Sequence, residues 1–236
     1  VPPGERSHLE SKVRAQGFAD FSIRPPGLRE PLSAIIYLEP FSGRNLAAFG
    51  FDMLSESTRR QAMLAAAESA ETRLSGKVTL MQETHGKVQP GLLMYVPVYR
   101  AGQPLNTPSE RMQALRGFVY SPYRVHDLMN GIFANRSLAI DFELFATPGG
   151  APQELLFSSL GEQATPQTPL SQRELNLHGQ TWLLKFYAPA GFAASLLHSQ
   201  RPLLALGGLG VNGGGQVGGN ICHGVLGAIF QRKVNW

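Results

Sequence analysis

The sequence predicts an α+β fold made of two stacked units. The chain has 236 residues, enough for one large or two small domains, and 43% of them are hydrophobic, as a packed core requires. In the first part, short apolar runs that fit strands alternate with helical patterns. From residue 138 onward, alternating strands and a hairpin signal dominate. Strands interspersed with helices, followed by a smaller hairpin-rich unit, favour two layered α+β units.

The chain opens with a helix and a strand. Residues 5–16 are polar and carry Leu9 and Val13 on one face, which predicts a surface helix. Gly17 is placed to end that helix, because glycine readily adopts the left-handed conformation that commonly follows a last turn. Residues 18–23 then predict a strand.

The stretch from residue 35 to residue 99 organises the first unit. Apolar runs at residues 35–38 and 47–51 fit two buried strands. Asp52 follows the second run directly, at the point where the strand gives way to a helix. Its carboxylate can cap the turn that follows, as short polar side chains commonly do.

A helix is expected next. Ser55 or Ser57 can cap it, because a serine oxygen accepts from the free backbone N–H groups of the first turn. Glu56 lies near the same end, where the helix dipole favours a negative charge. One face at helical spacing carries the apolar residues Met63, Ala67, Ala70 and Leu74. The pair Ser75-Gly76 is expected to stop the helix.

Three further strands complete the first unit. They are predicted at residues 77–82, 92–98 and 116–120. Gln89-Pro90-Gly91 turns the chain between the first two of these strands. Residues 101–109 are rich in Gly, Pro and Asn, which predicts a loop.

The second unit follows an amphipathic helix predicted at residues 123–135, whose inward face holds Val125, Leu128, Met129 and Ile132. Residues 138–145 alternate as a half-buried strand does, and residues 154–157 predict a short strand. A hairpin is expected over residues 173–187, turning at His178-Gly179. The two units should meet between the helix and the first of these strands.

Composition and motifs argue against several function classes. The formal net charge is +4 and the sequence pI is about 9.4, but no block of Lys and Arg interleaved with aromatics occurs, so nucleic-acid binding is not expected. None of the six histidines stands at metal-ligand spacing, and the chain has no G-x-S-x-G, Cys–His pair or phosphate-binding loop. We therefore expect no catalysis, no metal and no cofactor. The one cysteine, Cys222, cannot form an internal disulfide.

The C-terminal part is rich in glycine. Residues 203–230 contain no Asp, Glu, Lys or Arg and are long enough to span a bilayer, but glycines and amides make a poor membrane helix. Residues 208–213 match G-x-G-x-x-G, yet more glycines follow instead of a helix. No acidic residue follows Glu174, which disfavours a dinucleotide site and a nucleotide-dependent enzyme. We interpret residues 191–211 as an exit helix entering a membrane segment. We expect residues 212–236 to be a poorly packed tail, either a degenerate continuation or a non-native extension.

Four sequence strings that lie before the second unit resemble a known family. They read FGFDMLSESTRR, ETRLSGKVTLMQE, QPGLLMYVPVYR and ALRGFVYSPYRVHDLM. Over about the first two thirds of the chain they are similar to the CHASE domain, the extracytoplasmic sensor of many bacterial membrane receptors and of the plant cytokinin receptors. The resemblance implies two PAS-like lobes with antiparallel sheets, flanked by helices that lead to membrane segments. Residues 1–136 would be the membrane-distal, ligand-binding lobe and residues 137–190 the smaller, membrane-proximal lobe.

The resemblance also implies a ligand site. In cytokinin-binding members, the aspartate of the string that matches Asp52 and Met53 hydrogen-bonds the adenine edge, and a carboxylate suits paired N–H donors. The family's pocket leucine falls on Leu74 and its pocket threonine on Thr84, whereas residues 93–96 depart from the plant pattern, which can alter the ligand. The expected ligand-binding residues are Asp52, Met53, Leu74, Thr84, Met94, Phe118 and Tyr120. Most are apolar, as is usual in a small-molecule cleft, and the competing interpretation makes them ordinary core residues.

The function implied is that of a small-molecule sensor. The chain begins at Val1 and shows no signal peptide, so we interpret it as a fragment of a periplasmic or extracellular receptor domain that follows a membrane helix. The ligand would be an adenine-type or other heterocycle, the domain a homodimer without catalytic activity, and the receptor's cytoplasmic output a histidine kinase or a diguanylate cyclase. The alternative is a non-sensing dimerisation or spacer module. A dry, collapsed core in the first lobe would favour that alternative.

Overall fold

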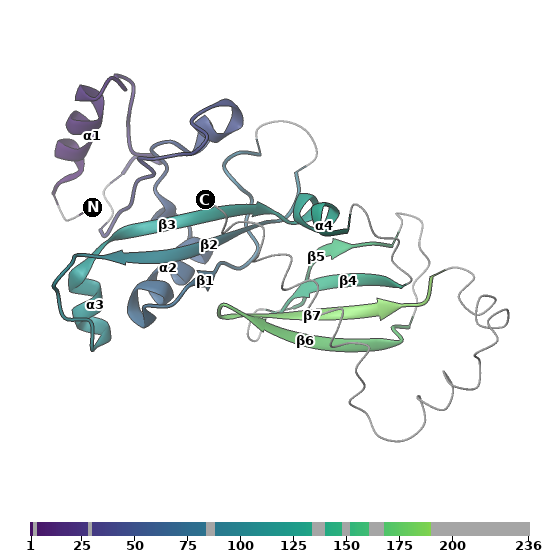
Figure 1. Ribbon diagram of the computed structural model, residues 1–236. Helices are drawn as coiled ribbons and strands as arrows, with labels where there is room; N and C mark the ends of the chain where they lie inside the picture. The colour runs from purple at the N-terminus through teal and green to yellow at the C-terminus, as the bar shows by residue number, and fades with distance from the viewer. Residues whose placement is uncertain are drawn as a thin grey trace, which may run out of the picture.

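Two antiparallel sheets lie side by side in the computed structural model of this chain, with a helix at their junction (Figure 1). The structure describes residues 1, 4–27, 30–83, 88–133, 140–147, 152–160 and 168–189. Its mixture of helices and antiparallel strands confirms the predicted α+β class. The predicted exit helix, the glycine-rich tail and the expected junction at residues 135–138 lie outside the described residues.

The first sheet has three strands in the order β1-β2-β3. They are β1 (Arg73–Leu74), β2 (Gly91–Tyr99) and β3 (Leu115–Arg124). The long β2–β3 pair is antiparallel and places Tyr95 opposite Tyr120. It confirms the strands predicted at residues 92–98 and 116–120, and β3 continues four residues beyond the predicted end.

The second sheet has four strands in the order β5-β4-β7-β6. They are β4 (Asp141–Ala146), β5 (Glu154–Ser158), β6 (Ser171–Leu177) and β7 (Gln180–Tyr187), and they confirm the predicted second-unit strands. The β6–β7 hairpin turns where predicted, with φ of 46° at His178 and 84° at Gly179. Two successive positive φ values are those of the two-residue turn that matches the natural twist of a hairpin.

Four α-helices accompany the sheets in the described residues. They are α1 (Arg6–Ala15), α2 (Ser57–Ser69), α3 (Pro108–Ala114) and α4 (Val125–Phe133). The first and last confirm the predicted helices. Helix α2 ends earlier than expected, because Ala70 adopts the left-handed conformation with φ of 59°, and Leu74 belongs to β1 instead. The loop predicted at residues 101–109 is confirmed up to residue 107, and α3, which was not predicted, overlaps its last two residues and starts with a capping box between Thr107 and Glu110.

Four predicted strands, at residues 18–23, 35–38, 47–51 and 77–82, are wrong. In the third, residues 47 and 48 end the 3-10 helix η1 (Gly43–Ala48), residues 49 and 50 form a turn, and Phe51 makes a single bridge with Arg24. The other three segments are irregular, apart from a single bridge between Val78 and Gly91. Residues 78, 80 and 82 are buried and alternate with more exposed neighbours, yet this segment makes only that one bridge, so its pattern of burial does not by itself make a strand. Gly50 explains why the strand predicted at residues 47–51 does not form. Its φ is +80°, and a Cβ there would lie 2.3 Å from the Ser22 carbonyl oxygen.

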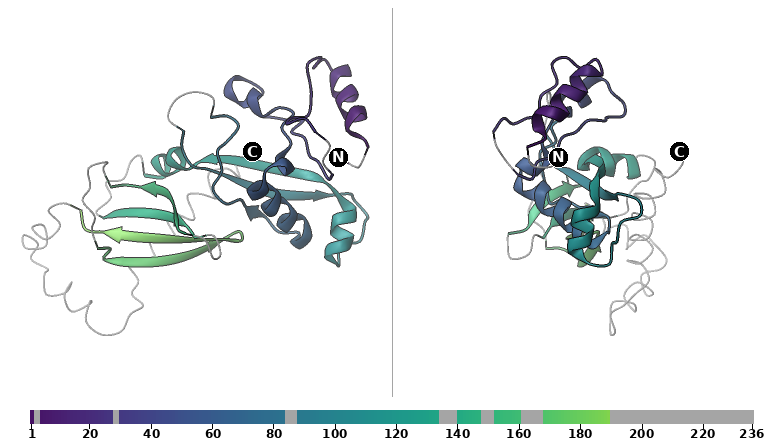
Figure 2. Two further views of the ribbon diagram at one scale, coloured as in Figure 1. Left: turned by 180° about the vertical axis from the view of Figure 1, so that it is seen from behind. Right: turned by 90° about the vertical axis from the view of Figure 1, so that its left-hand side faces the viewer.

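Two hydrophobic cores lie on opposite faces of the first sheet. The helix-side core lies between the sheet and α2 and consists of Ile35, Ala48, Phe51, Met53, Leu54, Ala62, Met63, Ala66, Val78, Leu80, Leu93 and Tyr95. The inter-sheet core joins both sheets and α4 and consists of Leu74, Leu92, Val125, Met129, Phe142, Leu144, Ala146, Leu156, Leu177, Trp182, Leu184 and Phe186. Figure 2 shows α2 against the first sheet and α1, which has a small core of its own, far from the second sheet.

Strand β2 takes part in both cores. Leu93 and Tyr95 belong to the helix-side core, while Leu92 belongs to the inter-sheet core and Met94 packs against it. Successive side chains of a strand point to opposite faces, so each core receives every second residue of β2. The division of the chain at residues 136–137 stays a prediction.

None of the helices that the structure describes is long and apolar enough to cross a membrane.

Candidate ligand-binding site

The N-terminus of α2 is capped by Glu56. Its carboxylate accepts hydrogen bonds from the backbone N–H groups of Thr58 and Arg59, at 2.8 and 3.0 Å. The predicted caps, Ser55 and Ser57, are therefore wrong: the Ser55 hydroxyl donates to the Asp52 carbonyl oxygen, and the Ser57 hydroxyl donates to Glu56. A carboxylate has two acceptor oxygens, so one side chain can satisfy two of the free donors of the first turn.

Glu56 is ionised at neutral pH. Partial burial by itself would raise the pKa of its carboxyl, but the hydrogen bonds from Thr58 and Arg59 outweigh burial and lower that pKa below its ordinary value. The positive end of the α2 dipole favours the same charged form.

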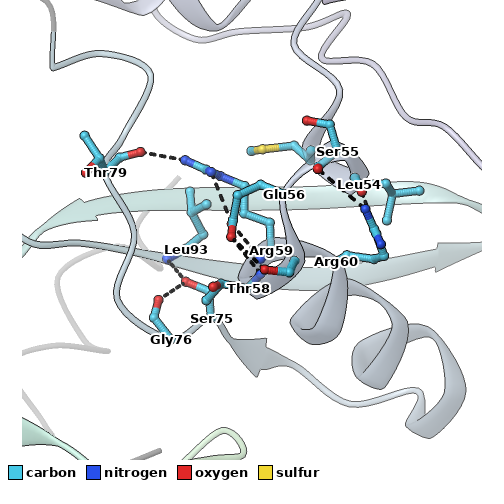
Figure 3. A network of polar contacts seen from close by, with 12 residues as sticks. Leu54, Ser55, Glu56, Thr58, Arg59, Arg60, Ser75, Gly76, Thr79 and Leu93 are labelled. Carbon is cyan, nitrogen blue, oxygen red and sulfur yellow. Dashed lines mark hydrogen bonds and ion pairs between the residues drawn. The ribbon is translucent and has the colours of Figure 1, made fainter. Parts of the chain in front are cut away.

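Arg59 is a buried cation on the inner face of α2 (Figure 3). Only 5% of it is exposed. One terminal nitrogen lies 3.3 Å from a carboxylate oxygen of Glu56, the other donates to the Thr79 carbonyl oxygen at 2.6 Å, and the guanidinium stands 5.4 Å from the centre of the Phe51 ring. Its Nε is buried and has no hydrogen-bond partner among the described residues. A buried charged donor without an acceptor is costly, which marks this nitrogen as a feature to be explained.

A small cavity lies beside Arg59, between α2, the first sheet and the segments that precede them. Its volume is about 10 Å³, room for roughly one water molecule. The lining residues are Ile35, Ala48, Met53, Arg59, Leu80, Met81, Gln82, Leu93 and Tyr120. The wall is therefore mainly apolar, with three polar side chains and no carboxylate.

The two tyrosines near this cavity stay protonated. Burial raises the pKa of Tyr120 to about 12 and raises that of Tyr95 still further. The Tyr95 hydroxyl lies 3.8 Å from the Met53 sulfur, a weak acceptor. Both phenols therefore present a hydrogen-bond donor at every physiological pH.

Asp52 is fully buried and does not line this cavity. One of its carboxylate oxygens accepts from the Ser33 backbone N–H at 2.8 Å, the Ser33 hydroxyl at 2.9 Å and the Leu54 backbone N–H at 3.0 Å. The last of these bonds caps the short 3-10 helix η2 (Met53–Ser55), as the capping interpretation of this residue predicts. The carboxylate thus ties η2 to the segment around Ser33.

The structure divides the other predicted site residues between the two faces of the first sheet. Met53 and Tyr120 line the cavity beside Arg59, and Phe118 packs against the same core. Leu74 and Met94 pair across β1 and β2 and line a second cavity on the opposite face. The remaining residue, Thr84, lies outside the described residues.

The second cavity is also about 10 Å³ in volume and is almost entirely apolar. Its lining residues are Leu74, Leu92, Met94, Tyr123, Leu128, Leu177 and Trp182. Trp182 contributes a buried indole N–H that has no hydrogen-bond partner among the described residues. This cavity lies within the inter-sheet core.

The sequence analysis missed Arg59 and Gln82. For Arg59 a signal existed, because it stands four residues before Met63 and so shares the inner face of α2. For Gln82 a signal also existed, because it alternates in step with Val78 and Leu80, and all three are buried. Among the described residues, no three His, Cys, Asp or Glu side chains gather as a metal site requires.

The two antiparallel sheets and their helices define a mixed α+β domain, and the comparison with protein families is specific. The family model for the CHASE domain matches residues 1–157, from before α1 to within β5. This chain belongs to the CHASE domain family. Members of this family are extracellular sensory domains of receptors, and the domain itself is a sensor and not a catalytic unit. A search of curated proteins found no match.

Proposed function

We propose that this chain is the extracytoplasmic small-molecule sensor domain of a membrane-bound receptor and that its ligand binds in the cavity beside Arg59. The observation that carries the proposal is the buried, incompletely bonded guanidinium in an otherwise apolar wall. Sites for small molecules usually combine apolar lining with a few polar groups that fix orientation. Family membership supplies the sensory role, and the cavity supplies a place for it.

The cavity must expand to admit a ligand. At about 10 Å³ it holds roughly one water molecule. Met53 and Met81 form part of its wall, and methionine is unbranched and adapts its shape readily. We propose that these side chains move aside on binding, so the ligand selects a conformation with an opened helix-side core.

The proposed signal passes through β2. Leu93 lines the cavity, and its neighbours Leu92 and Met94 contact the inter-sheet core. A ligand that displaces β2 on one face therefore changes packing on the other. The finer parts of this proposal are a periplasmic or extracellular location, two PAS-like lobes, membrane attachment through flanking helices, a homodimer, and a histidine kinase or diguanylate cyclase as output.

A second candidate function is a dimerisation or spacer module without a ligand. The small volume of the cavity favours it, because a collapsed helix-side core is what such a module would have. In that case Arg59 serves only to tie α2 to the Thr79 segment.

A thermal-shift screen separates the two. Adenine derivatives, other N-heterocycles, amino acids and small carboxylates are added to the protein, and a ligand is expected to raise the Tm. Ala48→Val narrows the cavity and should abolish the shift, whereas Ala146→Val makes the same change in the inter-sheet core and should preserve it. If no compound raises the Tm of the wild type, the spacer function is correct.

A further inference from the structure

We infer that the cavity beside Arg59 selects a small carboxylic acid with an apolar body, rather than a ligand that offers hydrogen-bond donors. The inference rests on the proposed function, since it names the ligand class of the same cavity. Three observations carry it: the incomplete bonding of Arg59, the donor character of the other polar wall groups, and the engagement of Asp52 elsewhere.

The guanidinium has donor capacity left inside the protein. Arginine carries five N–H donors, and the described residues give it one carboxylate and one carbonyl partner, through its two terminal nitrogens. Within the described part of the chain, the Nε–H is buried without an acceptor. Arginine's planar fork matches a carboxylate, and such charge-assisted bonds are among the strongest that a protein makes.

The remaining polar wall groups also suit an acceptor. Tyr120 keeps its proton, so its hydroxyl can donate, and the Gln82 side chain carries an amide NH₂. No Asp or Glu is among the described residues that line the cavity, so this part of the wall offers no negative charge to a ligand's N–H groups. Ile35, Leu80 and Leu93 surround these groups with apolar surface, which suits a hydrocarbon body.

Asp52 is engaged by the protein itself. Its buried carboxylate accepts from Ser33 and Leu54 and lies outside the cavity lining. A donor-bearing ligand would have to displace these bonds and leave buried N–H groups without acceptors. The charged acceptor that such a ligand needs is thus already used, and the described wall offers it only neutral acceptors, the Gln82 amide oxygen and the Tyr120 hydroxyl oxygen, whereas the charged donor that an acid needs is available.

Glu56 does not cancel the charge of Arg59 completely. Its contact with the guanidinium is long, at 3.3 Å, and the same carboxylate accepts from two backbone N–H groups of α2. The positive end of the helix adds to the field on this side of the cavity. A ligand carboxylate would therefore meet a net positive environment.

Titration calorimetry with benzoate and benzamide tests the inference, because the two differ in charge and acceptor strength but share shape. Benzoate should bind the wild type at least tenfold more tightly than benzamide, since a bond to a charged group contributes about 1.5–3 kcal/mol. Gln82→Glu supplies a carboxylate from the wall and should weaken benzoate binding at least about tenfold. Gln113→Glu makes the same change on the exposed side of α3 and should leave binding unchanged.

Tyr120→Phe gives a second test that leaves the charges intact. It should weaken benzoate binding severalfold, while Tyr37→Phe, at an exposed tyrosine, should not. A readout without any ligand is the Tm of Gln82→Glu. It should equal or exceed that of Gln113→Glu, because the new carboxylate can accept from Arg59.

The outcomes are distinguishable. The carboxylate inference would be overturned if the wild type bound benzamide or adenine more tightly than benzoate, and if that binding were lost in Asp52→Ala and kept in Gln82→Glu. The sensor proposal would then still stand. Absence of binding by every compound of the screen would overturn both. A Tm of Gln82→Glu well below that of Gln113→Glu would contradict the idea that the Arg59 side chain lacks an acceptor.

Discussion

The two cores on either face of the first sheet are built differently. The inter-sheet core has no charged residue among its buried members, and it joins elements from residue 74 to residue 186. The helix-side core contains methionines and a tyrosine and surrounds the buried Arg59. Burying a charge does little for stability even when it is paired, so the helix-side core carries a cost that the inter-sheet core avoids. The contrast indicates that one face of the sheet contributes mainly to stability, while the other face contains the buried polar groups of the proposed site.

The largest effect that we expect concerns the inter-sheet core. Trp182→Ala removes a buried indole that lines the second cavity together with Leu74 of the first sheet and Leu128 of α4, and should lower the free energy of unfolding by about 3–5 kcal/mol. Urea denaturation followed by circular dichroism measures this. Because the core is shared, the wild type should unfold in one transition. Val119→Ala, at an exposed valine of β3, is the control and should change stability by less than about 0.5 kcal/mol. Two separate transitions would show that the sheets are stabilised independently.

A middle-sized effect is expected at Asp52. Replacement by alanine removes the acceptor of the half-buried Ser33 N–H, at about 1–3 kcal/mol, whereas the Leu54 N–H keeps a second acceptor, the Ser33 hydroxyl oxygen at 3.2 Å. We therefore expect a loss of about 2 kcal/mol, more than the loss of a helix cap alone would give. Asp20→Ala, on an exposed loop, is the matched control. A stability equal to the wild type would mean that the carboxylate is available for a ligand after all.

The smallest effect is expected at Glu56, and it depends on pH. Glu56→Gln weakens the α2 cap and should cost about 1 kcal/mol at neutral pH. The pKa of Glu56 is lower in the folded protein than its ordinary value of 4.5, so its contribution is complete above that value and disappears as the pH falls through the folded pKa. The stability difference between wild type and variant should therefore close on acidification. Glu71→Gln, at an exposed ion pair with Arg73, should show almost no difference at any pH.

The regular parts of this fold were predictable from the sequence because they repeat with a fixed period. Alternation at Phe142 and Leu144 gave β4, and the turn at His178-Gly179 gave the β6–β7 hairpin. The strands predicted around Ile35 and Val78 were wrong because a buried irregular segment can carry the same apolar pattern as a strand, and the sequence does not show which segments find a pairing partner. Helix α3 was missed although its capping box, Thr107 to Glu110, was legible.

The candidate site was predicted only in part. Met53 and Tyr120 do share a cavity, but Leu74 and Met94 lie on the opposite face, because neighbouring positions of a strand alternate and a motif match does not say which face each takes. Arg59 was overlooked because a charged residue near a helix start is usually at the surface. The sequence pattern cannot report which carboxylate is already engaged, as Asp52 is with Ser33.

Because β2 contributes side chains to both cores, the length of this strand can tolerate few insertions or deletions. One residue inserted between Leu92 and Tyr95 would turn every following side chain to the other face, sending Tyr95 into the inter-sheet core and its neighbours toward Arg59. The connection between β2 and α3 is exposed and carries no such constraint. Insertions and deletions should therefore accumulate between residues 101 and 106 and be purged from β2, so that the strand keeps its length while the loop beside it varies.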